Sequence, residues 1–157
     1  LRAMNRDLTE TEMEEVLGTQ LYGHLGCTLS NQRVYVVPIM YAYHDGAICS
    51  FSFPGLKIET LRQHASVCFQ TEQFLSEGVW RSVIVWGTYE EIPDQERTGA
   101  IAILSERLQR EHGTATSSFY QPPRSGFAPG VFRILKEESP ILYRIRVEQK
   151  TGKHVQY

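Results

Sequence analysis

The strongest chemical signal in the sequence is a serine and a lysine on either side of a predicted break between a strand and a helix. Ser52 lies near the end of a strand-like run, Pro54 and Gly55 interrupt that run, and Lys57 opens a helix-like segment over 57–62. A helix start leaves backbone N–H groups without partners and carries the positive end of the helix dipole. A phosphate here would find N–H donors, a hydroxyl and an ammonium group. We interpret this corner as a candidate anion site.

The same corner has a plainer interpretation. A glycine followed by a lysine is common where a strand turns into a helix, so Lys57 could be a solvated surface charge and Ser52 could face water. The glycine spacing of a Walker loop or of a dinucleotide-binding loop is missing. Known nucleotide-loop motifs therefore do not decide the matter, and both interpretations of Lys57 stay open.

A tight turn positions the strand that leads to this corner. Asp45 and Gly46 supply the positive backbone angles of a two-residue hairpin connection. They join an apolar run over 34–43 to a second strand over 47–53. Side chains alternate along a strand, so the serines of the second strand share one face and its cysteine and phenylalanines share the other.

The remaining segments predict a chain built mostly of short strands. Thr9 and Glu12 form a capping box before a helix over 10–20, and Asp94 is the predicted cap of a helix over 95–110. Few helices among many strands favour a small antiparallel barrel, because a parallel sheet needs a helix between most strands. Further strands are predicted over 23–29, 66–71, 82–92, 131–135 and 141–148, the last two as a hairpin before a polar tail.

The composition is that of an ordinary folded chain. Its 157 residues are expected to form one domain over 1–157, with 41% hydrophobic and 22% charged residues. A net charge of -2 with scattered basic residues argues against nucleic acid as a partner. No apolar run is long enough to span a bilayer, and the acidic amino end is unlike a signal peptide, so we expect a cytoplasmic protein without a membrane partner.

Metal and hydrolase chemistry find no support in the sequence. Five histidines and three cysteines show no metal-ligand spacing, and no nucleophile elbow or zinc-protease helix occurs. His24 could face a site, but it is more typical of a core or surface histidine. We therefore predict no metal site and single out no catalytic residue.

A long irregular segment over 112–130 is rich in glycine and proline and exceeds the usual length of a loop. Such segments are often lids over binding sites, and Tyr120, Arg124 and Phe127 are its candidate contact residues. A surface connection that merely wraps the barrel is the alternative. Both interpretations stay open.

A set of short segments, taken in order and spacing, carries a family resemblance over about 9–147. These segments are Tyr22-Gly23-His24-Leu25, Tyr35-Val36-Val37-Pro38-Ile39, Asp45-Gly46, Gly55-Leu56-Lys57, Val67-Cys68-Phe69 and Trp80-Arg81-Ser82-Val83. Together they resemble the FMN-binding split-barrel family of the pyridoxamine 5'-phosphate oxidases, and within it the branch of nitroimidazole-resistance proteins. The resemblance implies a mainly β, antiparallel split barrel of Greek-key type with flanking helices.

The resemblance also implies FMN at the interface of a homodimer. In that family, residues at the positions of Pro38, Ile39 and Met40 lie against the isoalloxazine ring, partly through their backbone. Ser82 falls where relatives place a polar side chain against the flavin, and Trp80 lies near the dimer seam.

Ser52 and Lys57 match family positions near the phosphate of the flavin. Leu56 replaces the arginine that precedes this lysine in the oxidases, so Arg62 or Arg81 could support the phosphate instead. The carboxyl-terminal segment does not match the substrate-binding ending of the oxidases. Vitamin B6 oxidation is therefore not the expected activity.

The leading hypothesis is an FMN-dependent oxidoreductase acting on a small organic molecule, with a nicotinamide cofactor as electron donor. The flavin would supply the redox chemistry, so no acid or base need be assigned. One alternative is a haem-binding or cofactor-storing protein without turnover, with His24 or His64 as the iron ligand. The other is a deazaflavin-dependent reductase.

Overall fold

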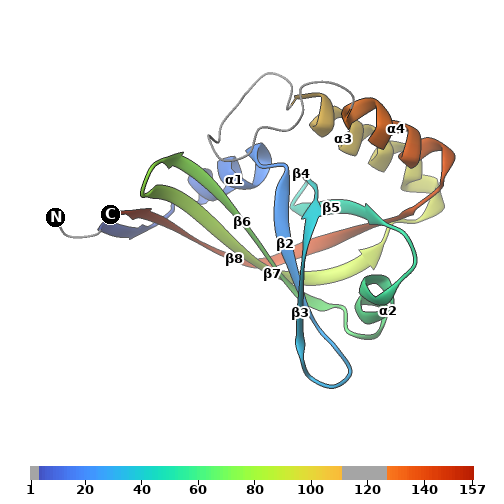
Figure 1. Ribbon diagram of the computed structural model, residues 1–157, viewed down its shortest axis with the longest axis horizontal. Helices are drawn as coiled ribbons and strands as arrows, with labels where there is room; N and C mark the ends of the chain where they lie inside the picture. Colours follow the sequence, from blue (N-terminus) through green and yellow to red (C-terminus); the bar gives the residue numbers. More distant parts are fainter. Residues whose placement is uncertain (1–3, 111–126) are drawn as a thin grey trace.

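The computed structural model describes residues 4–110 and 127–157, whose eight strands form one curled antiparallel sheet (Figure 1). The strand order is β3-β2-β6-β7-β8-β5-β4, and β1 pairs with β8. This architecture confirms the predicted antiparallel split barrel with flanking helices. The strands are β1 Met4–Asp7, β2 Tyr22–Thr28, β3 Val34–Met40, β4 Ala42–His44, β5 Ala47–Ser52, β6 Ser66–Ser76, β7 Val79–Glu91 and β8 Ile141–Gln156, and the helices are α1 Glu10–Thr19, α2 Leu56–Gln63, α3 Arg97–Arg110 and α4 Phe127–Glu137.

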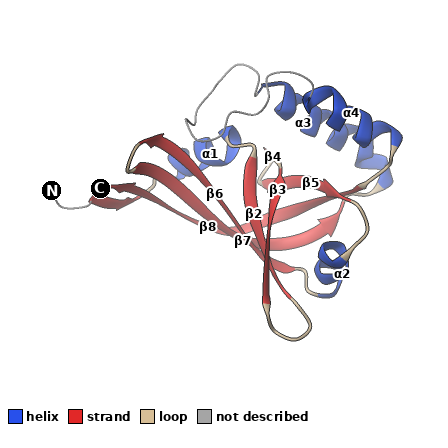
Figure 2. Ribbon diagram, in the orientation of Figure 1, coloured by secondary structure: helices blue, strands red, loops and turns tan. Residues whose placement is uncertain are grey.

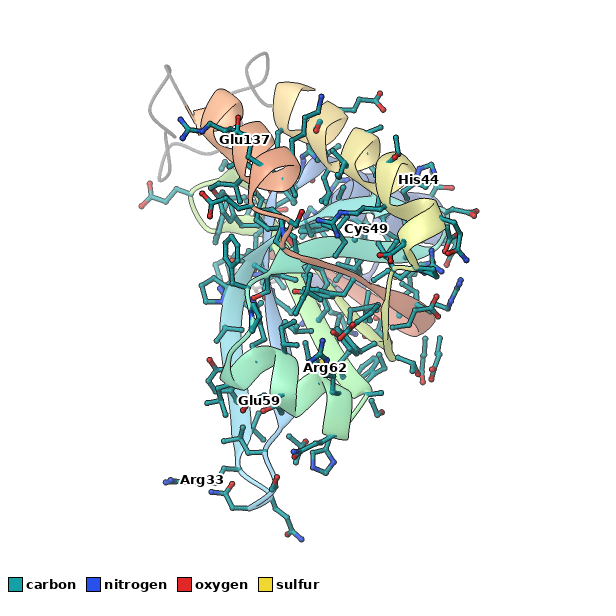
Figure 3. The ribbon with its side chains drawn as sticks, turned by 90° about the vertical axis from the view of Figure 1, so that its right-hand side faces the viewer. Arg33, His44, Cys49, Glu59, Arg62 and Glu137 are labelled. Atoms are coloured by element: carbon teal, nitrogen blue, oxygen red, sulfur yellow. The ribbon has the colours of Figure 1, made fainter. Side chains whose placement is uncertain are left out.

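Two apolar clusters hold the helices on the sheet. Inside the curl, α1 contributes Val16 and Leu17 and α2 contributes Ile58 and Leu61, all of them buried against the inner side chains of the strands. A second cluster lies between β4–β5 and the pair α3–α4, which Figure 2 shows side by side. Figure 3 shows Cys49, a member of this cluster, on β5. The inner cluster therefore fixes α2, and with it the predicted anion site, to the barrel.

Contacts at both ends stabilise helix α1, and the sequence predicted the contact at its N-terminus. The capping box is confirmed: the Glu12 amide donates to Thr9 Oγ1 at 3.2 Å, and the Thr9 amide donates to a Glu12 carboxylate oxygen at 2.9 Å. At the other end, the Arg107 guanidinium of α3 donates to the carbonyl of Thr19. A cation at this end complements the negative pole of the helix dipole. This second contact bridges 88 residues of sequence, so local patterns could not predict it.

The predicted strand over 34–43 is divided in two at Tyr41. This residue is 1% exposed, its hydroxyl donates to the carbonyl of Leu17 at 2.8 Å, and its ring meets the Phe69 ring edge-on at 4.8 Å. The backbone therefore turns inward between β3 and β4. The turn that follows is as predicted, because Asp45 and Gly46 have φ angles of 49° and 68°.

The carboxyl-terminal third corrects two predictions. The segment 131–135, predicted as a strand, lies within α4, because Val131 and Leu135 are four residues apart and are both buried on one helix face. The predicted polar tail after residue 148 is the last part of β8, which pairs there with β7 and β1. Polar residues suffice for these strands because the backbone, rather than the side chains, makes the ladder.

Other boundaries also differ from the sequence prediction. Strand β6 continues to Ser76 and β7 begins at Val79, so the two form a longer ribbon than expected. Asp94, the predicted cap of the helix, instead opens a 3₁₀ turn over Asp94–Glu96, and α3 begins three residues later at Arg97. The last four residues of the loop predicted over 112–130, among them the candidate contact residue Phe127, belong to α4 instead, whereas Tyr120 and Arg124 lie outside the described residues. Among the helices that the structure describes, none has the length and apolar character needed to cross a membrane.

Candidate functional site

The corner between β5 and α2 is open to solvent. Gly55 is the N-cap of α2 and offers no side-chain capping bond to the first turn. A Cβ placed on Gly55 would meet no atom within 4 Å, so a ligand can approach the helix start closely. Phe53 and Leu56, 45% and 55% exposed, flank this opening. The corner therefore combines helix N–H groups that have no hydrogen-bond partner in the helix with apolar side chains that are exposed to solvent.

Lys57 is half-buried at this open helix start. Burial lowers the pKa of its amine, and the nearby Cys27 thiol partly opposes that shift. The amine has no hydrogen-bond or ion-pair partner among the described residues. A desolvated cation without a partner is unfavourable, and an anionic ligand would offset its cost. Lys57 is therefore only partly solvated in this structure.

The two arginines that could have replaced Lys57 already have carboxylate partners. Arg62 of α2 pairs with Glu91, and Arg81 of β7 pairs with Glu15 at 3.2 Å. These ion pairs engage both guanidinium groups within the protein. Of the three cations considered from the sequence, Lys57 is the one without an ion pair among the described residues.

The serines of β5 share the inner side of their strand, as the alternation predicted, but they differ in access. Ser50 is 1% exposed, and its hydroxyl donates to the Met40 carbonyl at 2.7 Å. Ser52 lies at the rim of the barrel, partly exposed, and its hydroxyl donates to the Phe53 carbonyl at 3.2 Å. Only Ser52 is placed where it can meet a ligand at the corner.

A second group of predicted residues lies on what we call the outer face, the even-numbered side chains of β3, β2, β6 and β7. Pro38, Met40, Trp80 and Ser82 all belong to it, because the strand registers pair even residues with even residues. Ile39 lies between two of them, but its side chain is 4% exposed in the core, so only its backbone can meet a ligand.

The outer face is apolar where β3 and β7 are exposed. Val34, Val36 and Trp86 are 75%, 59% and 41% exposed. At the far end of the ribbon, the Trp80 ring packs on the rings of Tyr157 and Phe74, with centroids 5.4 and 6.5 Å away. Among the residues described, no hydrogen bond or ion pair joins this face to the Ser52–Lys57 corner. The predicted site residues therefore form two separate groups within one chain.

His24 is a residue of the outer face that the sequence did not assign to the flavin site. It lies opposite Pro38 in β3 and opposite Gln70 in β6. The His24 Nδ1 atom lies 3.1 Å from Gln70 Oε1, and Gln70 Nε2 donates to a Glu72 carboxylate oxygen at 2.6 Å. The signal that could have found it is the alternation of β2, which places His24 on the same face as the residue paired with it in β3.

Comparison with known proteins decides the family. Residues 9–153 match the family model described as Pyridoxamine 5'-phosphate oxidase. The chain belongs to this family. The resemblance seen in the sequence motifs is thereby confirmed.

Relatives support the same assignment. An uncharacterized protein of Rhizobium meliloti is 28% identical over 98% of this chain and 94% of its own length. The crystal structure of an FAD-binding protein from Mesorhizobium loti is 29% identical, with a TM-score of 0.71 over 96% of this chain and 98% of that one. A candidate 5-nitroimidazole antibiotic resistance protein from Bacteroides thetaiotaomicron, 20% identical, has the same fold, with a TM-score of 0.69 over 99% of this chain and 90% of that one.

Proposed function

We propose that this protein is a flavin-dependent oxidoreductase that holds FMN and acts on a small organic molecule, with a nicotinamide cofactor as electron donor. One observation carries the proposal: Lys57 is a half-buried cation without a partner among the described residues, at an open helix start. Family membership supports the same function. The cytoplasm is the compartment we propose for it.

The corner fits the phosphate of a flavin nucleotide. The uncapped first turn of α2 provides backbone N–H donors, and Lys57 provides the positive charge. The Ser52 hydroxyl lies at the end of β5, just before this turn. Bonds from backbone N–H groups and an ammonium group to a phosphate are charge-assisted, and they are stronger than bonds between neutral groups.

The outer face fits one side of the flavin ring. The side chains of Val36, Trp86 and Pro38 offer an exposed apolar surface. A ring on this surface would remain open to water on its other side. A second copy of the chain can cover that side, and exposed apolar patches of this kind are typical of interaction surfaces. We therefore propose a homodimer with the ring at the seam.

When bound, the flavin would supply the electron-transfer chemistry. The chain's own residues would bind and orient it: Lys57 and the α2 start hold the phosphate, and Pro38 and Met40 border the ring. Trp80 and Ser82 lie farther along the same face, where they would meet the ring, a substrate or the second copy. The side chains covering the seam would exclude water from the reacting ring.

The identity of the flavin is the first point to test. The similar structure from Mesorhizobium loti is of an FAD-binding protein, so FAD is the main rival to FMN. Extraction of the freshly purified protein followed by mass measurement separates FMN, FAD and a deazaflavin. Recovery of FMN is the expected result, and recovery of FAD or of a deazaflavin alone would replace it.

Replacement of Lys57 by alanine tests the phosphate site. Loss of a charge-assisted bond should weaken FMN binding about 10-fold or more in a fluorescence titration. Arg133→Ala is the matched control, because it removes an exposed charge on α4 whose ion-pair partner among the described residues is the exposed Glu137 one turn away. Equal FMN affinity in the Lys57→Ala variant and the wild type would contradict the site.

A charge placed on the outer face tests the homodimer. Val36→Asp or Trp86→Asp should convert the dimer to a monomer, as measured by light scattering, because an unpaired carboxylate would be buried in the seam. Leu75→Asp is the control, since it is a similarly exposed apolar residue at the tip of the ribbon. A wild-type chain that is monomeric with flavin bound would refute the seam.

The haem alternative rests on the exposed position of one candidate iron ligand, His24. Of its two candidate ligands, His24 lies on the outer face, whereas His64 is the C-cap of α2 and lies off that face. Figure 1 shows α2 beside the barrel, on the side opposite the tip of the β6–β7 ribbon. An absorption spectrum of the purified protein separates the two functions, because a flavin profile supports the proposal and an intense Soret band supports haem.

A further inference from the structure

The side chains of His24, Gln70 and Glu72 form a chain of hydrogen bonds across β2 and β6. Glu72 accepts from Gln70 Nε2 at 2.6 Å, and a carboxylate can only accept. This bond fixes the orientation of the Gln70 amide, whose oxygen then faces His24 Nδ1 at 3.1 Å. An amide oxygen is also only an acceptor, so Nδ1 must carry a proton. In a neutral imidazole, Nε2 is then left with its lone pair.

The location of His24 allows this lone pair to accept a hydrogen bond from a ligand. His24 is exposed on the outer face, opposite Pro38, and Ile84 lies beyond Gln70 in the next strand. Binding sites for flat organic rings are mostly apolar, with a few polar groups that fix the orientation of the ligand. An acceptor nitrogen among these apolar neighbours matches a ring N–H donor.

We propose that His24 recognises the bound flavin by accepting a hydrogen bond at Nε2 from the N–H of the ring, and that Gln70 and Glu72 are positioning residues that hold His24 in the required tautomer. This inference rests on the proposed function. The isoalloxazine system carries one such N–H, at N3 between two carbonyl groups, and FMN and FAD share it. The role of His24 is therefore the same for either cofactor.

A flavin without this donor provides the direct test. FMN and its N3-methyl derivative are titrated into the wild type, into His24→Ala and into His64→Ala, an exposed histidine off the outer face. The wild type and His64→Ala should bind the methylated flavin about 5-fold to 10-fold more weakly than FMN, the usual value of one hydrogen bond. His24→Ala should bind both flavins alike. The same discrimination in His24→Ala as in the wild type would overturn the inference.

The positioning role has its own readout, which needs no flavin. Long-range ¹⁵N NMR of the imidazole should show the Nδ1–H tautomer of neutral His24 in the wild type. Gln70→Met keeps the length of the side chain but removes both hydrogen bonds, so the Nε2–H tautomer should become the major one. A wild-type chain with Nε2–H as its major tautomer would overturn the inference.

The outcomes for the two proposals are separate. A folded wild-type chain that binds neither FMN nor FAD overturns the proposed function, and the role of His24 with it. A chain that binds FMN with the same affinity before and after His24→Ala keeps the proposed function and loses only this inference.

Discussion

Two partly buried lysines of this protein have opposite surroundings. Lys150 of β8, with a side chain 14% exposed, lies between Glu10 and Glu14 of α1 and bonds a Glu14 oxygen at 2.7 Å. The Tyr43 hydroxyl donates to the same oxygen at 2.8 Å. Lys57 of α2 has no such partner among the described residues. Within the part of the chain that the structure describes, the first lysine has carboxylate partners and the second has none.

The pKa values of the two amines follow this difference. Burial lowers the pKa of Lys150, but hydrogen bonds to Glu10 and Glu14 outweigh burial and raise it above its usual value. Burial also lowers the pKa of Lys57, and the Cys27 thiol opposes that shift only in part. A paired buried charge is a structural element, whereas an unpaired one marks a place where a ligand of opposite charge can stabilise the protein.

The largest expected effect comes from breaking the paired lysine. Lys150→Met should lower the free energy of unfolding by about 1–3 kcal/mol, less than for a fully buried pair because both glutamates are partly exposed. Chemical denaturation measures this change. Flavin affinity should stay as in the wild type. A variant with unchanged stability would show that the pairing around Lys150 is not structural.

Removal of the unpaired lysine should have the opposite sign and a smaller size. Lys57→Met removes a desolvated charge, so the free energy of unfolding of the flavin-free protein should stay the same or rise by up to about 1 kcal/mol. The same denaturation experiment measures it. A loss of more than about 1 kcal/mol would mean that Lys57 is a structural residue.

Alkaline pH should sharpen the contrast. The folded-state pKa of Lys150 lies above the unfolded value near 10.5, so its contribution is present below that pH and declines as the pH rises beyond it. The folded-state pKa of Lys57 lies below 10.5, so stability increases as the pH rises through that lower value. As the pH approaches 10.5 from below, Lys57→Met should therefore lack a gain in stability that Lys150→Met retains. If the free energies of unfolding of the two variants changed with pH in the same way, the paired state of Lys150 and the unpaired state of Lys57 would be contradicted.

The smallest effect is expected at an exposed lysine. Lys153 pairs with Asp7, with side chains 54% and 81% exposed. Lys153→Met should change the free energy of unfolding by less than about 0.5 kcal/mol, because exposed pairs are screened by water and salt. If Lys153→Met lowered the free energy of unfolding as much as Lys150→Met, burial would not determine how much an ion pair contributes to stability.

Local signals in the sequence predicted the parts of the fold that local chemistry determines. The capping box of Thr9 and Glu12, the turn at Asp45-Gly46 and the helix after Gly55 were all predicted, since each depends on residues a few positions apart. The segment 131–135 was wrong because Pro129 and Gly130 suggest a break. Pro129 instead lies in the first turn of α4, where its missing N–H would have no helical partner.

The candidate site was predictable only in part, because its two halves depend on different information. The corner at Lys57 follows from composition and order, but its lack of a partner depends on where every other charge lies in space. Strand alternation places Pro38 and Ser82 each on one side of its own strand, but only the register of four strands shows that these sides form one face. The hydrogen-bonded chain from His24 to Glu72 joins β2 to β6, 46 residues apart, and so lies beyond local patterns.

The strand order also explains how the sheet escapes uncontrolled polymerisation. Its first edge strand, β3, contains Pro38, which lacks the N–H needed to extend a ladder, and its last, β4, spans only three residues. Neither end of this path of seven strands is a good template for an incoming strand. We therefore expect little edge-to-edge growth into filaments, whereas the homodimer proposed above, joined through a face, would close after two copies.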